Sequence, residues 1–423
     1  MLRATVVLVA AGAATLGARD AHAAGFQNLS QSATATAMGS VGTANPDEPN
    51  SNFYNPANMV FQDTWQVYVG NTNILPSSSY TSPAGDRTET LPAFFPPPNL
   101  NIAVPLPAIG AAVGIGVTLP YGLGIAWPDD WEGRDTIVSQ TLQTYNINPN
   151  VAFKIPNVDL GVSVGGQVYL STVELNQTFI LRDDVEVPAQ IGGSGSGFGF
   201  TAAVMYKPIE NLTVGLNFRS GATIDYEGRA HFEGEEGTVF EQTFIDQDVT
   251  TAISIPNAVT LGFGYQLADL FLEVDVNFTT WSDYEKLDLE FSEPCEAGDQ
   301  TCSVADGDTT NPPTTTIVSN WNDAVAFRLG AQYSINDQID VRAGAVLDLT
   351  PIPDQTLSPS LPGNNRVAFS LGGGYTTDFG LRADLGYQFV NALEREVGAV
   401  NQNLPGTYTT TAHVLGINLG YGY

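Results

Sequence analysis

The sequence predicts an all-β protein: a 14-stranded antiparallel transmembrane β-barrel with an N-terminal plug (hatch) segment. Apolar and polar residues alternate with a period of two along most of the 423-residue chain. Turn residues recur at roughly ten-residue spacing, as in outer-membrane barrels, and no apolar run reaches the about 20 residues of a membrane-spanning helix. Residues 24–60, in contrast, lack the alternation.

The alternation is clearest near the C-terminus. Between residues 381 and 389, apolar side chains alternate with Arg382, Asp384, Gly386 and Gln388. We expect strands at 64–75, 99–106, 111–126, 143–155, 158–176, 196–207, 211–232, 240–267, 269–291, 321–334, 338–348, 365–377, 379–391 and 410–423. The segment containing Pro256 could form two strands, but bacterial barrels favour an even strand number.

The connections predict the orientation of the barrel. Short connections such as 208–211 and 336–337 suit periplasmic turns. Long polar connections suit the outer side, at 76–98, 127–142, 177–195, 292–320, 349–364 and 392–409. The five tryptophans fall near strand ends, where aromatic girdles form: Trp65, Trp127, Trp131, Trp281 and Trp321.

The N-terminus is typical of a secretory signal peptide. Arg3 precedes an apolar stretch, and an A-x-A site at residues 21–23 predicts cleavage near Ala23. We therefore divide the chain into a signal peptide (1–23), a plug (24–60) and a barrel (61–423). This arrangement indicates the outer membrane of a Gram-negative bacterium, with outer-membrane lipid around a chain that we expect to be monomeric.

Charge and cysteine content exclude some classes of partner. With 15 basic against 45 acidic residues, the chain lacks the basic clusters that nucleic acids require. Cys295 and Cys302 suit one local disulfide in an oxidising compartment. The acidic residues of 293–308 could hold calcium, but their spacing does not match an EF-hand and a solvated loop is the simpler interpretation. We expect no metal and no cofactor.

Six stretches, in this order, resemble motifs of the FadL-type outer-membrane transporters. They are Ala24-Gly25-Phe26-Gln27, Asn52-Phe53-Tyr54-Asn55-Pro56-Ala57, Trp131-Glu132-Gly133-Arg134, Pro256-Asn257 with Leu261-Gly262, Trp281-Ser282, and Asp348-Leu349-Thr350-Pro351-Ile352-Pro353 followed by Arg366. The resemblance covers residues 24–423. It implies passive uptake of hydrophobic small molecules, long-chain fatty acids or aromatic hydrocarbons, through a plugged barrel with a lateral exit.

The third predicted strand carries the most pointed local feature. Its alternation is interrupted at Pro120, Tyr121 and Gly122, and proline cannot donate to a strand ladder. The resemblance places a kinked strand here, which implies a lateral exit over residues 120–124. The alternative is that the strand simply ends and a loop begins.

Four arginines fall on the inward parity of their strands: Arg328, Arg342, Arg366 and Arg382. Inward placement is expected because a charge facing lipid costs about 2–4 kcal/mol at mid-depth. They could brace the wall through ion pairs with inward carboxylates. Alternatively, Arg328, Arg342 or Arg366 could bind a ligand carboxylate, since guanidinium binds carboxylate in a bidentate fork.

Apolar residues flank the plug and could line a ligand pocket: Phe26, Leu29, Phe53 and Tyr54. They could equally pack the plug against the wall. The hatch motif Asn55, Pro56 and Ala57 is interpreted as a structural turn, because proline restricts φ and asparagine favours turns.

Catalysis has no support in the sequence. The mature chain contains two histidines, His231 and His413, and neither lies in a pattern typical of a hydrolase triad. We therefore do not expect an enzyme. Two rival classes remain, a general diffusion porin and an adhesive surface barrel; the distinct segment 24–60 argues against an open porin.

Overall fold

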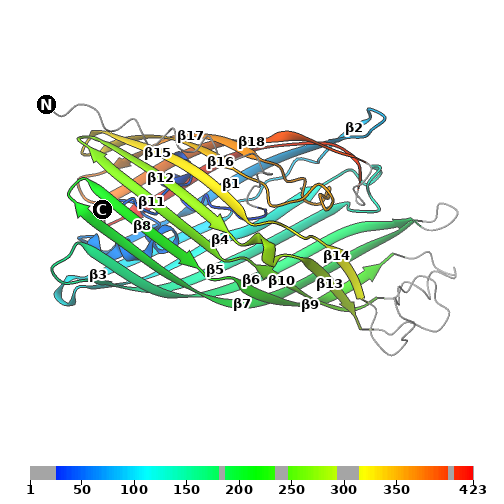
Figure 1. Cartoon of the computed structure of the whole chain (residues 1–423), viewed down its shortest axis with the longest axis horizontal. Coiled ribbons are helices and arrows are strands. Elements are labelled where there is room, and N and C mark those ends of the chain that lie inside the picture. Colours follow the sequence, from blue (N-terminus) through cyan, green and yellow to red (C-terminus); the bar gives the residue numbers. More distant parts are fainter. Residues whose placement is uncertain (1–24, 181–185, 234–245, 293–313, 399–403, 423) are drawn as a thin grey trace.

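A computed structural model describes residues 25–180, 186–233, 246–292, 314–398 and 404–422 (Figure 1). The expected signal peptide, both cysteines and the acidic stretch 293–308 lie outside the described residues. Among the residues described, no helix is long and apolar enough to cross a membrane.

The chain forms one closed sheet in which every named pairing is antiparallel. Its strands are β1 (Gln66–Thr81), β2 (Arg87–Glu89), β3 (Pro98–Leu106), β4 (Ala111–Ala126), β5 (Ser139–Lys154), β6 (Leu160–Ile180), β7 (Glu186–Ile209), β8 (Leu212–Arg219), β9 (Ala222–Phe232), β10 (Gln247–Ile255), β11 (Ala258–Leu267), β12 (Leu270–Thr279), β13 (Lys286–Phe291), β14 (Thr314–Val318), β15 (Ala324–Asn336), β16 (Ile339–Asp348), β17 (Arg366–Thr376), β18 (Leu381–Val397) and β19 (Gly406–Tyr421). Pairing of β1 with β19, from Val67↔Tyr421 to Thr81↔Thr407, closes the barrel.

The labelled strands form 14 longer strands that each run along the barrel wall, called staves below. The predicted fold class is therefore confirmed. The count is smaller than the number of labelled strands because β8 with β9, β10 with β11, β12 with β13, and β14 with β15 each continue one stave across a short break. β2 lengthens the stave of β3 by pairing with the outer end of β1.

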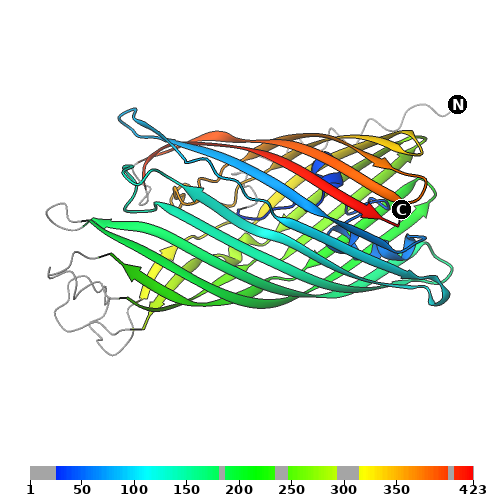
Figure 2. The same cartoon turned by 180° about the vertical axis from the view of Figure 1, so that it is seen from behind.

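The strands extend further outward than the sequence predicted. β6 and β7 pair as far as Ile180↔Glu186, whereas a loop was expected over residues 177–195. β18 and β19 likewise pair as far as Val397↔Gly406. The reason is that these outer parts carry polar residues on their outward face, so the apolar alternation that marks a membrane strand fades while the ladder continues. Figure 2 shows these extensions at the end opposite the C-terminus.

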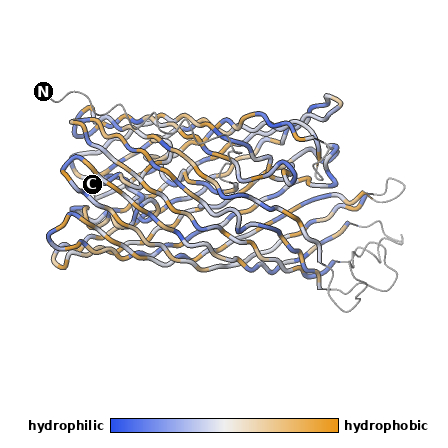
Figure 3. The backbone as a smooth tube through the Cα atoms, viewed as in Figure 1, coloured by the Kyte–Doolittle hydropathy of each residue, from blue (hydrophilic) through white to orange (hydrophobic). Residues whose placement is uncertain are grey.

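Along β17 the barrel wall is apolar outside and polar inside. Phe369 and Leu371 are exposed on the outer face of β17, while Ser370 between them is buried. Hydrophobic and hydrophilic residues alternate along the strands all around the wall (Figure 3). This pattern suits a wall that meets lipid on one side and a polar interior on the other.

Residues 25–61 lie inside the barrel, toward the end with the short turns (dark blue in Figures 1 and 2). They form α1 (Ala33–Ala37), α2 (Ser51–Tyr54) and the 3₁₀ helix η2 (Pro56–Phe61). α1 packs on β16 to β19 and β1, and η2 packs on β3 to β7. Two further 3₁₀ turns, η3 (Pro107–Ile109) and η6 (Trp281–Asp283), join or interrupt strands.

The predicted aromatic girdle is wrong for four of the five tryptophans. Trp65 is half exposed and lies beside Tyr421, but the others are buried inside the barrel: Trp127, Trp131, Trp281 and Trp321. Trp281 and Trp321 lie at breaks between strand pairs, where the side chain turns inward. The rings therefore build an internal core instead of an interfacial belt.

Candidate functional site

A cavity of about 470 Å³ lies inside the barrel beside the N-terminal segment. Its lining includes residues 25–30, residues 95–98 and parts of β1 and β4. Its polar corner holds Arg328, Asp348, Arg366 and Gln388, while most of the remaining lining is apolar. Such a mostly apolar cavity with a few polar groups is typical of a site for a hydrophobic ligand.

The barrel wall beside this cavity contains a stretch in which β3 and β4 are not paired, called the seam below. The ladder between these strands ends at Leu100↔Val117, although β4 continues to Ala126. The register of β4 against β5 shifts between Thr118 and Tyr121. The strand therefore does not end at Pro120; it bulges there and loses its neighbour on one side.

The N-terminal segment supplies backbone partners in the part of this seam that adjoins the β3–β4 ladder. The Asn28 amide donates to the Pro120 carbonyl at 2.8 Å, and the Gly122 amide donates to the Phe26 carbonyl at 3.0 Å. Gln27 and Tyr121 form an isolated antiparallel bridge. A break in a barrel wall must be compensated, because unsatisfied backbone groups are costly at membrane depth. Residues 26–28 provide that compensation from inside.

A second apolar cavity of about 410 Å³ lies further toward the outer end. Apolar side chains of the extended strands and of an inserted loop line it, including Leu175, Ile191, Ile253, Leu287, Trp321 and Ile352. Phe26, Leu123, Leu142 and Leu361 line both cavities, so these residues lie at the partition between the two spaces.

Aromatic rings surround Phe26 at this partition. Its ring centroid lies 4.7 Å from that of Trp281, 5.9 Å from that of Trp321 and 6.1 Å from that of Tyr121. Edge-to-face contacts of this kind stabilise a ring position without a hydrogen bond that must be broken. The Phe26 ring is thus held by packing against other rings.

The loop between β16 and β17 completes the partition. Ion pairing of Arg395 with Asp354 at 2.6 Å and a hydrogen bond from Arg395 to the Ile352 carbonyl hold it in the barrel. The Trp127 indole also donates to the Pro359 carbonyl at 3.1 Å. The predicted outer loop is therefore folded into the lumen, where its residues contribute to both cavities.

The inward arginines are not equivalent. Arg342 is completely buried, with its guanidinium 2.7 Å from Asp384 and 3.1 Å from Asp340. Arg382 also pairs with Asp384, at 2.7 Å. Neither lines the two large cavities. Arg382 also donates to the Thr34 hydroxyl of the plug at 3.3 Å, whereas the ion-pair partners of Arg342 lie on the wall.

Arg366 and Arg328 do line the inner cavity. Arg366 lies 2.8 Å from Asp348 and is partly exposed. Arg328 is 4% exposed and, among the described residues, forms no ion pair or hydrogen bond. Asp348 and Asp275 are close enough to act on it electrostatically. Arg328 is thus a buried cation that faces an apolar cavity without a direct partner in the described part of the chain.

The other predicted plug residues divide between cavity and packing. Phe26 and Leu29 line the inner cavity, but Phe53 and Tyr54 do not. The Tyr54 hydroxyl donates to the Leu29 carbonyl at 2.6 Å, and Phe53 packs under the guanidinium of Arg219 at 3.9 Å. Phe53 and Tyr54 border a much smaller cavity of about 20 Å³ between plug and wall.

The hatch motif ties the plug together. Asn55 accepts from the Ala57 amide at 3.1 Å and donates to the carbonyls of Thr43 and Val204, at 2.7 and 2.9 Å. Pro56 begins η2, where its missing N–H costs nothing. The sequence reasoning missed Arg219, a buried cation on β8 that contacts the Phe53 carbonyl. The inward parity of Thr213, Gly215 and Asn217 could have identified it.

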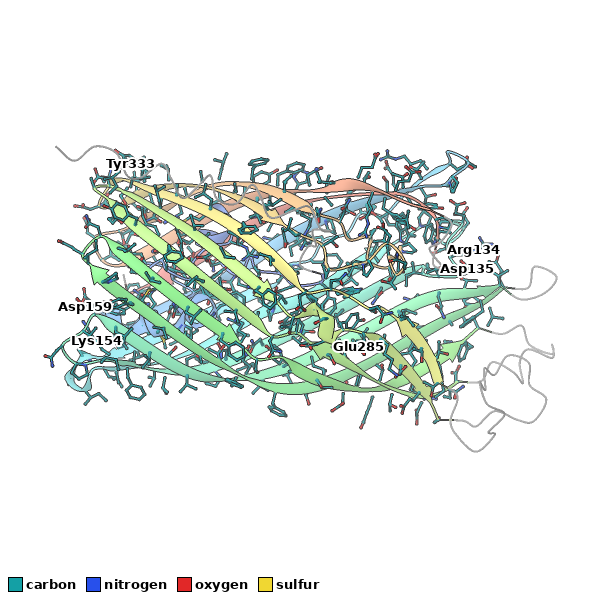
Figure 4. The ribbon with its side chains drawn as sticks, viewed as in Figure 1. Arg134, Asp135, Lys154, Asp159, Glu285 and Tyr333 are labelled. Atoms are coloured by element: carbon teal, nitrogen blue, oxygen red, sulfur yellow. The ribbon has the colours of Figure 1, made fainter. Side chains whose placement is uncertain are left out.

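Charged side chains at the two rims pair locally. Figure 4 shows Arg134 at one end of the barrel and Lys154 with Asp159 at the other. Arg134 lies 2.6 Å from Glu186 at the outer end, and Lys154 lies 3.1 Å from Asp159 at the end with the short turns. Within the described ranges, no group of three or more histidine, cysteine, aspartate or glutamate side chains is placed to hold a metal ion.

Comparison with known proteins identifies relatives over most of the chain. "Outer membrane protein P1" of Haemophilus influenzae is 25% identical over 366 residues, covering 77% of this chain and 75% of the relative. The "Long-chain fatty acid transport protein" of Escherichia coli is 24% identical over 424 residues, covering 90% of each.

Solved structures share the fold. A Pseudomonas aeruginosa FadL homologue superposes with a TM-score of 0.82 at 19% identity, covering 94% of this chain and 99% of its own. The Pseudomonas putida toluene transporter TodX superposes with a TM-score of 0.71 at 15% identity, covering 93% and 98%.

The family match is nearly complete in length. The profile described as "Outer membrane protein transport protein (OMPP1/FadL/TodX)" matches residues 14–423. With its closed barrel and these relatives, the protein is located in the outer membrane of a Gram-negative bacterium. The chain belongs to the OMPP1/FadL/TodX family of outer-membrane transporters for hydrophobic compounds.

Proposed function

We propose that this protein carries long-chain fatty acids passively across the outer membrane. The acid is captured in the outer cavity, moves past Phe26 into the inner cavity, and leaves sideways through the seam at Pro120 to Gly124. The plug stays in place, because its backbone is tied to the wall on several sides. The proposed route therefore bends around the plug instead of passing through it.

Arg328 is the observation that carries this proposal. Its guanidinium lies at the polar corner of an otherwise apolar cavity and has no direct partner among the described residues. A buried charge without a partner is costly, so a ligand that brings a carboxylate gains more there than in water. Arg366 is already neutralised by Asp348 at 2.8 Å, which leaves Arg328 as the preferred anchor.

The rest of the cavity matches the other part of such a ligand. Its wall includes Leu29, Ile74, Leu119 and Val390. An acyl chain would remove this apolar surface from water, which contributes about 25 cal/mol per Å² buried. Head and tail of the ligand thus have separate complementary surfaces.

Binding of a long-chain fatty acid and of toluene to the purified, refolded barrel tests the proposal. Arg328→Gln should weaken fatty acid binding by about 10- to 100-fold, since a hydrogen bond to a charged group contributes about 1.5–3 kcal/mol. Binding of toluene should not change. Arg134→Gln, at the outer rim and outside the inner cavity, is the matched control.

One other function has specific support. The rings of Phe26 and Phe95 line the inner cavity, and they would also suit a neutral aromatic hydrocarbon. Preference for toluene over the acid, with no effect of Arg328→Gln on either, would reject the fatty acid proposal. The protein would then be a hydrocarbon channel whose arginines only stabilise the wall.

A further inference from the structure

We propose that Phe95 is the gate of the lateral exit, and that the size of its ring controls how fast ligands leave the inner cavity. This inference rests on the proposed lateral route and adds a specific residue to it. Phe95 lies in the segment between β2 and β3, outside the kinked strand and outside the plug.

The backbone around Phe95 is fixed to β1 and leaves β4 uncovered. Phe95 and Ile74 exchange both backbone hydrogen bonds, at 2.7 and 3.0 Å, and the Thr72 amide donates to the Pro97 carbonyl at 2.9 Å. Residues 96–98 are three prolines, which have no N–H to offer to β4. The segment therefore extends the wall from the β1 side without closing it on the β4 side.

The open stretch has defined limits. At one end it is limited by the last β3–β4 pair, Leu100↔Val117. At the other end it is limited by the hydrogen bond from the Leu91 amide to the Ala126 carbonyl, at 2.8 Å. Between these limits, the plug supplies partners for the β4 backbone. Residues 26–28 pair with Pro120 to Gly122, and the Gln31 side chain bonds the Leu119 amide and carbonyl at 3.1 and 2.8 Å. Those partners reach Leu119 to Gly122 but not Gly124.

The side chain of Phe95 fills the space at Gly124. A Cβ placed on Gly124 would lie 1.9 Å from the Phe95 Cζ, and its two next neighbours would be atoms of the same ring. Glycine at this position lets the ring lie directly against the β4 backbone. Phe95, Gly122 and Gly124 all line the inner cavity, so the ring lies at the boundary between that cavity and the wall.

A side-chain gate differs physically from the closure by residues 26–28. Moving residues 26–28 breaks the two backbone hydrogen bonds at Pro120 and Gly122, whereas turning the Phe95 ring breaks none. Rotation of a partly exposed ring is also fast compared with backbone rearrangement. The ring can therefore open briefly for a passing acyl chain while the ladder around it stays intact.

Transfer of a fluorescent long-chain fatty acid from the barrel into liposomes containing a bilayer quencher measures the gate. Phe95→Ala should raise the transfer rate several-fold, Phe95→Leu should raise it less, and Phe95→Trp should lower it. Phe94→Ala is the matched control, because Phe94 is 59% exposed and does not line the cavity. Equilibrium binding should be unchanged in Phe94→Ala, and transfer rates of the Phe95 variants are compared at equal occupancy of the barrel by the fatty acid.

Gly124→Ala supplies an independent variant. Its methyl group would displace the ring, so transfer should accelerate as in Phe95→Ala, and the double variant should transfer no faster than Phe95→Ala alone. Equal transfer rates for Phe95→Ala, Phe95→Leu, Phe95→Trp and the wild type would overturn the gate. If changes at Pro120 and Gly122 still blocked transfer in that case, the lateral route would survive; if they too had no effect, the route itself would fail.

Discussion

Individual charges inside the barrel have two different roles. Arg342 and Arg382 both form ion pairs with Asp384. The three side chains form a compact charged cluster beside the plug. Removing one partner of such a buried cluster leaves an uncompensated charge and typically costs about 3–5 kcal/mol. Arg328 has no such contact among the described residues, which leaves it able to accept an incoming carboxylate.

Glu48 makes the plug sensitive to pH. This plug residue accepts hydrogen bonds from the Ser32 hydroxyl at 2.8 Å and from the Asn50 amide at 3.1 Å, so it links the N-cap of α1 to the start of α2. Burial away from water raises the pKa of the Glu48 carboxyl, and the two hydrogen bonds lower it. The effect of burial is larger, so the pKa is about 7. The folded plug therefore binds this proton more tightly than the unfolded chain.

Linkage between proton binding and folding fixes how the stability of the plug changes with pH. The stabilisation from the Glu48 proton is complete below the ordinary pKa of 4.5 and is lost as pH rises through about 7. Between pH 5 and 8, the opening free energy of residues 31–50 should fall, by on the order of 3 kcal/mol at most. Amide hydrogen exchange, corrected for its intrinsic pH dependence, measures this. Glu48→Gln should remove the dependence; an equally steep pH profile in that variant would contradict the assignment.

At the scale of elements, the plug fits because glycines of the wall let it lie against the strand backbones. A Cβ on Gly344 of β16 would lie 2.2 Å from backbone atoms of Met38 and Gly39. Gly386 and Gly416 approach the Ala33 backbone in the same way. Wall carboxylates then satisfy plug amides: the Ala44 amide donates to Glu273 at 2.6 Å. Packing and hydrogen bonding together keep the plug in one position.

Gly344→Ala should therefore displace the plug and make the barrel leaky. The added methyl meets backbone that cannot move aside, and overpacking of this kind costs about 1–3 kcal/mol. Ion conductance in planar bilayers should rise. Gly166→Ala is the control, because no heavy atom lies within 4 Å of a Cβ there. Equal conductance in the two variants would show that the plug does not depend on this contact.

The sequence predicted the strands well because lipid outside and polar groups inside enforce alternation along every stave. It could not predict that four neighbouring staves break at the same level, near Gly221, Pro256, Trp281 and Trp321. In the sequence, each break is only a local turn. The breaks come to lie at the same level because of the register in which the neighbouring strands pair. Trp281 and Trp321 were misjudged for the same reason, because they lie at two of these breaks.

The site was predictable in part. Inward parity located Arg328 and Arg366, but which arginine has a partner depends on strands that are distant in sequence: Arg342 on β16 pairs with Asp384 on β18. Pro120 marked the bulge, since proline cannot donate to the ladder. Phe95 carried no signal, because its role comes from lying opposite Gly124 across a gap that only the assembled barrel contains.

For the whole molecule, the two cavities and the seam suggest a passive path from the outer end of the barrel to its wall. The outer cavity is separated from the inner one by side chains, and the inner one reaches the wall at β4. Each step moves an apolar ligand between apolar surroundings, so no step exposes the acyl chain to the polar interior of the plug.

Uptake by the double variant Pro120→Val, Gly122→Val tests the lateral route most directly. Valine restores an N–H at position 120 and fills the bulge at position 122, so β4 can form a more continuous wall. With the barrel folded and fatty acid binding intact, we expect uptake of a labelled long-chain fatty acid to fall to the level of cells lacking the protein. Uptake equal to that of the wild type would contradict a sideways exit and require a path through the plug.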